Sequence, residues 1–241
     1  MIKTARGFTL IEMAIVLIII TILIGGLAVP LSAQIQARRI AETRKTMEEA
    51  REAILGYAMT HLAVTPGKRY LPCPDQNGNG TEDRILNNPA NGCATDHGWL
   101  PWVTLGTASQ DAWGNRLLYA VNVDFAHGTD GFSTNTPLAT TASFGVCSTH
   151  TCGAPNIASN VAFIVMSHGA NGWGALNVNG NSLAAPTGLD EVENVDADAT
   201  YISRIPTQVG AASGEFDDIL VWVSDSLLKA RVCPTGSDCS P

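Results

Sequence analysis

The sequence predicts an α+β protein in which a long N-terminal helix packs on an antiparallel β-sheet head with long loops. Three observations lead to this prediction. Residues 8–30 form an apolar run with a single charge, and residues 31–61 keep apolar side chains at helical spacing. The rest of the chain combines short β-branched runs with many Gly, Asn, Pro and Asp residues. We therefore expect four parts, at residues 1–7, 8–30, 31–62 and 63–241.

The apolar run is long enough for a single transmembrane helix. At about 1.5 Å per residue, 8–30 would reach roughly 34 Å, against about 30 Å for a bilayer core. Lys3 and Arg6 precede it, so residues 1–7 should stay in the cytoplasm and residues 63–241 should cross the membrane. A secretory signal or an uncut signal anchor would also be apolar. Neither explains Glu12, because a carboxylate in a membrane helix is costly and usually functional.

The segment after the apolar run is predicted to be an amphipathic stem. Gly25-Gly26 and Pro30 would weaken or kink the helix, or mark the point where it leaves the membrane. Beyond them an apolar stripe recurs every three or four residues, with oppositely charged pairs at four-residue spacing beside it. The stripe consists of Ala33, Ala37, Ile40, Met47, Ala50, Ile54, Tyr57 and Ala58.

Charge is divided unevenly along the chain. Residues 1–61 hold seven Lys/Arg against five Asp/Glu, whereas residues 62–241 hold seven against seventeen. Phosphate binding needs clustered cations, so an acidic outer domain argues against a nucleic-acid partner. Such a domain fits cation binding or a well-solvated surface.

Six cysteines, all beyond residue 72, indicate an oxidising compartment, with buried reduced thiols as the alternative. A zinc site is disfavoured because the sequence has no Cys-x-x-Cys pair. Six cysteines allow fifteen sets of pairings. Short loops favour Cys147–Cys152 and Cys233–Cys239, which leaves Cys73–Cys93.

The globular part shows β-strand patterns but no enzyme signature. Candidate strands are 117–123, 161–167, 175–178 and 219–223. Ser167-His168 follows an apolar strand, but adjacent strand residues point to opposite faces, which is poor geometry for activating a nucleophile. We predict that the protein is not an enzyme, with a membrane-anchored hydrolase as the alternative.

The residues Arg6-Gly7-Phe8-Thr9-Leu10-Ile11-Glu12 resemble the type IV prepilin signature. The resemblance implies a type IV pilin-like fold and a prepilin peptidase that cuts between Gly7 and Phe8 and methylates Phe8. It also implies that Glu12 pairs with the Phe8 amine of a neighbouring subunit during assembly. A buried carboxylate needs such a partner, because an unpaired buried charge is very costly.

Two short sequence segments in the globular part resemble segments of the major pseudopilin of type II secretion. They are Asp111-Ala112-Trp113-Gly114-Asn115 and Phe216-Asp217-Asp218-Ile219 with Trp222. The resemblance implies a structural subunit of a type II secretion pseudopilus or a type IV pilus-like filament in the bacterial inner membrane, with a periplasmic head. Its partners would be other pilin or pseudopilin subunits, the prepilin peptidase and the inner-membrane assembly platform. A minor or tip pilin acting as a binding module, or a plain membrane-anchored exported domain, remain alternatives.

Two acidic regions are candidates for calcium, and no other cofactor is expected. Residues 75–80 have the sequence Asp-Gln-Asn-Gly-Asn-Gly, which matches the first half of a calcium-binding loop. Leu86 occupies the position where an EF-hand needs Glu, and Asx-turns explain the same residues. The pseudopilin resemblance favours a second region, since that family binds calcium before its terminal Asp-Ile-x-x-Trp. A solvated acidic face is the alternative. The candidate ligands there are Glu191, Glu193, Asn194, Asp196, Asp198, Asp217 and Asp218.

Overall fold

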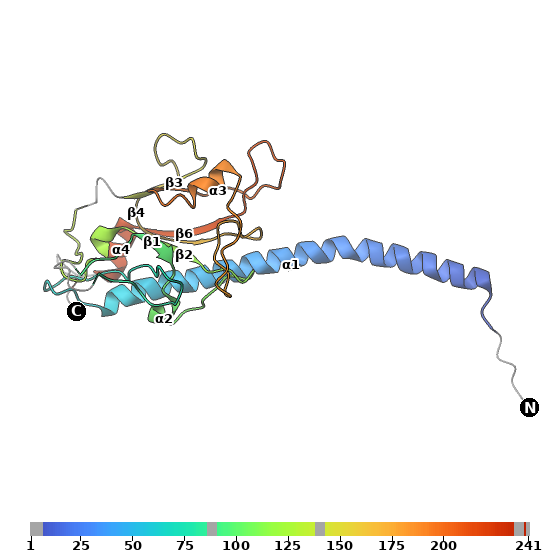
Figure 1. The fold of residues 1–241 in the computed structure, drawn as a ribbon, viewed down its shortest axis with the longest axis horizontal. Coiled ribbons are helices and arrows are strands. Elements are labelled where there is room, and N and C mark those ends of the chain that lie inside the picture. The colour runs from blue at the N-terminus through green and yellow to red at the C-terminus, as the bar shows by residue number, and fades with distance from the viewer. Residues whose placement is uncertain (1–6, 86–90, 138–142, 234–238, 240–241) are drawn as a thin grey trace, which may run out of the picture. The chain divides into compact units, whose positions relative to one another are not determined.

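The structure is a computed structural model that describes residues 7–85, 91–137, 143–233 and 239, with the backbone alone for residues 25–30. The chain divides into two compact units, Met1–Ala41 and Glu42–Pro241. The first helix, α1 (Leu10–Thr60), contributes to both (Figure 1).

Helix α1 has continuous helical backbone from Leu10 to Thr60, through Gly25, Gly26 and Pro30. In the Glu42–Thr60 part, its buried side chains recur every three or four residues, as the sequence predicts. They are Thr43, Met47, Ala50, Ile54, Leu55, Tyr57 and Ala58. Tyr57 donates a hydrogen bond from its hydroxyl to Glu82 over 2.8 Å, and the Ala112 amide donates to the Thr43 hydroxyl over 3.1 Å. This face of the stem therefore belongs to the core of the globular unit.

The described residues of the head form a six-stranded sheet in the order β1-β2-β4-β3-β5, with β6 also paired to β4. Its strands are β1 (His97–Trp99), β2 (Leu118–Val121), β3 (Phe144–Cys147), β4 (Ala158–Ser167), β5 (Thr200–Ile202) and β6 (Ile219–Ser224). The predicted antiparallel sheet is wrong in one respect, because β3 and β5 are parallel. The long connection between them, which contains β4, supplies the crossover that a parallel pair requires.

Three of the four predicted strands are present, as β2, β4 and β6. The prediction of a strand at 175–178 is wrong: Leu176 and Asn177 form only isolated bridges. The Asn177 side chain explains the difference, since its oxygen accepts from the backbone N–H groups of Asn179 and Asn181 and so closes a turn.

Four short helices complete the described head. They are α2 (Trp102–Leu105), the 3-10 helix η1 (Val123–Phe125), α3 (Leu189–Glu193) and α4 (Asp225–Val232). Helix α4 has ordinary end signals: Ser224 Oγ accepts from the Leu227 amide over 3.3 Å, and Lys229 and Arg231 lie in its last turn.

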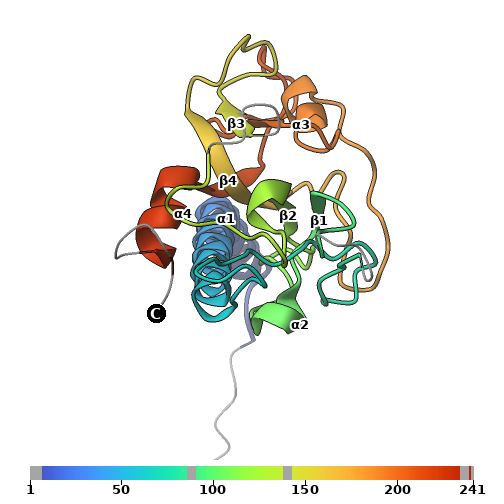
Figure 2. The same cartoon turned by 90° about the vertical axis from the view of Figure 1, so that its left-hand side faces the viewer.

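The core is built around β4, which is buried continuously from Val161 to Ser167. One cluster contains Ala120, Phe144, Val146, Val161, Ile164, Met166 and Tyr201, and a smaller one contains Cys147, Ile202 and Phe216. A strand covered on both faces reads as a continuous apolar run, which explains why β4 lacks alternation. Figure 2 shows β4 in the middle of the head, with β3 and α3 to one side. Phe216 anchors the segment that leads into β6.

Candidate functional site

The N-terminal candidate site is the start of helix α1, where Thr9 and Glu12 bond each other. The Thr9 amide and hydroxyl each donate to Glu12 Oε2 over 2.8 Å, and the Glu12 amide donates to Thr9 Oγ1 over 3.3 Å. This reciprocal arrangement is a capping box, which satisfies backbone N–H groups that the first turn of a helix leaves unpaired. It holds the Glu12 carboxylate beside the chain end that the sequence predicts for the processed protein, at the exposed Phe8.

Every residue from Gly7 to Ile24 is exposed. Within the described parts of the chain, no helix combines the length and the apolar character needed to cross a membrane. The predicted span of 8–30 includes residues 25–30, whose side chains lie outside the described residues. It stays a prediction from the sequence.

The second candidate site is a cluster of three carboxylates in the head. Glu191 belongs to α3, and Asp217 and Asp218 immediately precede β6. Each residue offers a carboxylate oxygen, and these oxygens all lie within 4.8 Å of one another. Glu191 and Asp218 are only 2% and 6% exposed. The fold therefore brings three of the seven predicted ligands together, from segments more than twenty residues apart in the chain.

Each carboxylate in this cluster is held by neighbouring donors. Glu191 Oε1 accepts from Asn171 Nδ2 over 3.1 Å and from the Asp217 amide over 3.0 Å. Asp217 Oδ2 accepts from the Asn171 amide over 2.9 Å, and Asp218 Oδ2 accepts from Asn194 Nδ2 over 2.8 Å. The sequence did not single out Asn171, although it positions two of the three acids.

Two oxygens of the cluster are buried without a hydrogen-bond partner among the described residues: Glu191 Oε2 and Asp217 Oδ1. Burial raises the pKa of Glu191 and of Asp217, and it raises the pKa of Asp218 well above its ordinary value. Buried carboxylates that lack donors need a counter-charge or a proton. An all-oxygen set of this kind suits a hard divalent cation such as calcium, so these residues fit the group that the sequence suggests.

The other predicted ligands lie apart from this cluster. Glu193, Asp196 and Asp198 form a separate group of carboxylates that is half-buried to exposed. Asn194 donates to Asp218 of the first cluster, and its oxygen already accepts from the Ile202 amide over 2.6 Å. The structure therefore gives Asn194 a positioning role, and the second predicted calcium region divides into two clusters.

The acidic loop at residues 75–80 is arranged by its own backbone. Asp75 Oδ1 accepts from the amides of Asn77 and Gly78, and Asp75 Oδ2 accepts from the amide of Gly80 over 2.6 Å. Both oxygens of this buried carboxylate are used, which is the Asx-turn arrangement that the sequence allows as an alternative to calcium.

The structure contains the two pairs that short loops favour, Cys147–Cys152 and Cys233–Cys239, and the remaining pair, Cys73–Cys93. All six cysteines are among the described residues, and none is free.

Ser167 and His168, the residues that could suggest catalysis, do not hydrogen-bond to each other in the described part of the chain. Ser167 Oγ donates to Asp111 Oδ2 over 2.7 Å, and Asp111 Oδ1 accepts from the amides of Trp113 and Asn115. Asp111 thus closes the turn of the Asp-x-Trp-Gly-Asn segment and joins it to the end of β4. The His168 ring is fully buried, and neither nitrogen finds a partner among the described residues. Burial lowers the pKa of His168 to about 4, so the ring is neutral near pH 7.

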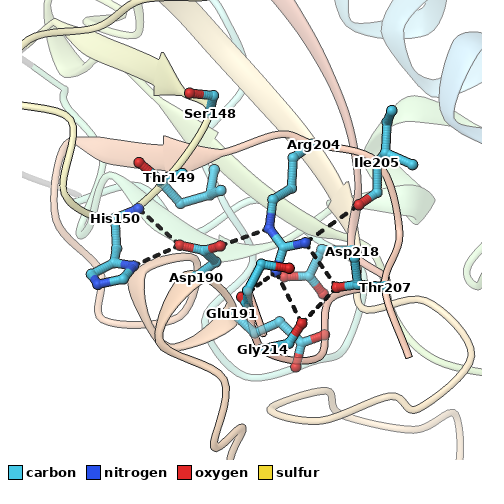
Figure 3. A network of polar contacts seen from close by, with 12 residues as sticks. Ser148, Thr149, His150, Asp190, Glu191, Arg204, Ile205, Thr207, Gly214 and Asp218 are labelled. Carbon is cyan, nitrogen blue, oxygen red and sulfur yellow. Dashed lines mark hydrogen bonds and ion pairs between the residues drawn. The ribbon is translucent and has the colours of Figure 1, made fainter. Parts of the chain in front are cut away.

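A polar network beside the carboxylate cluster was not predicted (Figure 3). Asp190 on α3 joins His150 of the Cys147–Cys152 loop to Arg204, which follows β5. These residues lie 40 and 14 positions from Asp190 in the chain. Nothing in the local sequence marks them as partners.

Comparison with known proteins places the N-terminal segment in a class. Residues 2–28 carry the type IV prepilin-like signal, because they match the family model described as the prokaryotic N-terminal methylation motif. Such a signal generally implies peptidase processing and assembly with pilin subunits, and it suggests a membrane-anchored or filament subunit. No curated protein and no solved structure matches the chain.

Proposed function

We propose that this protein is a structural subunit of a type IV pilin-like filament, cut between Gly7 and Phe8 and assembled through its N-terminal helix. The methylation motif at residues 2–28 carries the proposal. The filament would be a type II secretion pseudopilus or a type IV pilus-like filament, with the chain stored in the bacterial inner membrane and its head in the periplasm. Other pilin subunits, the prepilin peptidase and the inner-membrane assembly platform are the proposed partners, and no catalytic step is assigned.

The start of helix α1 supports an assembly role for Glu12. Its carboxylate is oriented by Thr9 through Oε2, while Oε1 makes no hydrogen bond among the described residues. That oxygen is available to a cation. In a filament, the amine freed on Phe8 of a neighbouring subunit would supply one, and pairing would offset the cost of burying both charges.

Processing is tested by N-terminal sequencing after co-expression with a prepilin peptidase. The expected mature chain begins at a methylated Phe8, and Gly7→Val should leave the precursor uncut. A native protein that begins at Met1, or beyond residue 30, would refute the proposal.

Assembly is tested separately with Glu12→Leu. The variant should fractionate with membranes and be processed, yet fail to enter filaments. Thr21→Val is the matched control, because its hydroxyl bonds only the backbone of its own helix, at Leu17 and Ile18, among the described residues. Normal incorporation of Glu12→Leu would contradict the role of Glu12. Immunogold counting of copies along the filament and at its tip distinguishes a main subunit from a tip-located binding module.

We also propose that the head binds one divalent cation, calcium, through Glu191, Asp217 and Asp218. The two unpartnered buried oxygens support this role. Isothermal titration of the full chain in detergent should give one calcium site, which the Glu191→Gln variant lacks.

A further inference from the structure

Helix α3 places two buried carboxylates in consecutive positions but directs them to different partners. Asp190 and Glu191 are 4% and 2% exposed. Asp190 Oδ1 accepts from the His150 amide over 2.9 Å and lies 2.7 Å from His150 Nδ1, while Oδ2 accepts from Arg204 Nε over 2.6 Å. Glu191 instead faces Asp217 and Asp218. One helical turn therefore joins the carboxylate cluster to two loops.

The first of these loops is the disulfide loop of residues 147–152. Its ring is closed by Cys147–Cys152, and Cys147 packs with Ile202 and Phe216 in the smaller core cluster. Both bonds from this loop to α3 come from His150, and they end on one oxygen of Asp190. The position of the loop tip thus depends on the position of α3.

The second loop comprises residues 204–216, and Arg204 organises it. Arg204 Nη1 donates to Thr207 Oγ1 over 2.8 Å, and Nη2 donates to the Ser213 carbonyl over 3.0 Å. Its guanidinium carbon lies 4.5 Å from the centre of the Phe216 ring. Figure 3 shows Arg204 between Asp190 and this loop. Asp190 therefore fixes the side chain that holds the loop together.

The other side of α3 faces buried carboxylates that need a counter-charge or a proton. Three carboxylates meet there, and Glu191 Oε2 is buried without a donor among the described residues. Like charges in a poorly solvated place repel, and this repulsion favours moving α3 away from Asp217 and Asp218. A bound cation would remove the repulsion. Because Asp190 and Glu191 are consecutive on one short helix, a movement of α3 away from Asp217 and Asp218 also shifts Asp190.

We propose that cation binding at Glu191, Asp217 and Asp218 orders the disulfide loop and the 204–216 loop through Asp190, which acts as a positioning residue. The inference rests on the proposed cation site and adds what the site controls. Two separate surface loops would then be set by one cation. The exposed apolar side chains Ile205 and Val209 lie on the second loop, so the cation would also fix how they are presented.

Hydrogen–deuterium exchange of the full chain in detergent, with saturating calcium or with chelator, tests the linkage. In the unaltered protein, calcium should slow exchange at 189–193 and 217–218, and also at 148–152 and 204–214. At free calcium about 100 times the dissociation constant, the slowing should approach 100-fold wherever opening requires release of the cation. Slowing that is confined to 189–193 and 217–218 would overturn the proposal.

Two variants separate the steps. Asp190→Asn should keep calcium affinity within about threefold, yet lose the calcium-dependent slowing in both loops. Arg204→Gln should lose it only at 204–214, and it serves as the second test if Asp190→Asn folds poorly. Loss of calcium binding in Asp190→Asn would contradict a positioning role. Absence of calcium binding in the unaltered chain would remove the cation site and this linkage, while processing and filament assembly stand on their own tests.

Discussion

Replacing Glu191 with glutamine should change stability in opposite directions with and without calcium. Glutamine keeps an oxygen that can accept from Asn171 and from the Asp217 amide, as Glu191 Oε1 does. It replaces the unpartnered Oε2 with an amide nitrogen that can donate to a carboxylate of Asp217 or Asp218. The change therefore relieves repulsion in the empty cluster, while it removes one charged ligand from the occupied cluster.

The magnitude follows from the contacts. A buried hydrogen-bond acceptor without a donor lowers the free energy of unfolding by about 1–3 kcal/mol. Glu191→Gln removes such an acceptor, so in chelator it should raise the free energy of unfolding by roughly that amount. For a domain of about 150–250 residues, 1 kcal/mol moves the melting temperature by about 2–4 °C, so we expect a rise of roughly 5 °C. Calcium at about 1,000 times its dissociation constant should add about 4.1 kcal/mol to the stability of the unaltered protein, or roughly 8–16 °C, and much less to that of the variant, so the calcium gain exceeds the gain from the substitution.

The assay is thermal unfolding of the full chain in detergent, in excess calcium and in chelator. The two melting temperatures should exchange rank between these conditions. Glu193→Gln is the matched control, because Glu193 is on the same helix but in the other cluster, and it should keep the full calcium response. The reasoning fails if Glu191→Gln shifts melting the same way in both conditions. If Glu193→Gln alone loses the response, calcium binds at the other cluster.

Three further predictions concern the stability of the head. Because burial lowers the pKa of His168 to about 4 while an unfolded His has an ordinary value near 6.5, its neutral form stabilises the fold fully above pH ~6.5. The free energy of unfolding should fall by roughly 3 kcal/mol as the pH falls from 6.5 towards 4. Urea unfolding at both pH values should show a smaller fall in the His168→Leu variant, and an equal fall in both proteins would contradict this. Gly188→Ala should cost about 1–3 kcal/mol, since its Cβ would lie 2.6 Å from the Glu215 carbonyl oxygen, whereas Gly153→Ala meets no atom within 4 Å and should leave melting unchanged. Replacing both cysteines of a disulfide with serine should lower the free energy of unfolding by about 3 kcal/mol at Cys73–Cys93 and by about 2 kcal/mol at Cys147–Cys152, because the first disulfide closes the longer loop. A higher urea midpoint for the variant without Cys73–Cys93 than for the variant without Cys147–Cys152 would count against this.

Local sequence predicted those parts of the fold that depend on neighbouring residues. The long helix, and strands β2, β4 and β6, were visible because apolar periodicity and β-branched runs are local signals. The local sequence did not predict the parallel pairing of β3 with β5. It joins residues more than fifty positions apart, and each strand is only three or four residues long. Short strands of this kind are specified by packing in the core, here of Phe144 and Tyr201, more than by the β-propensity of their own residues.

The candidate metal site also depends on contacts between distant segments, which the local sequence does not predict. The acids of residues 191–198 look like one group in the sequence, but Glu191 and Glu193 are two positions apart on α3. Residues at that spacing on a helix point to different sides, which explains why the group splits. Asn171, a residue with no distinctive local signal, joins Asp217 to Glu191, while Asn194 holds Asp218. The Asp190 network was missed for a related reason, since its partners come from two separate loops.

The Thr9–Glu12 capping box has a consequence for a chain that is shortened at its front end. Both partners lie downstream of the proposed cut, so losing the first seven residues leaves the capping box intact. Precursor and mature chain would then share one helix start, and the peptidase would expose a prearranged end without refolding it. In the proposed filament, the trimmed subunit would keep this capping box when it is added to a growing fibre.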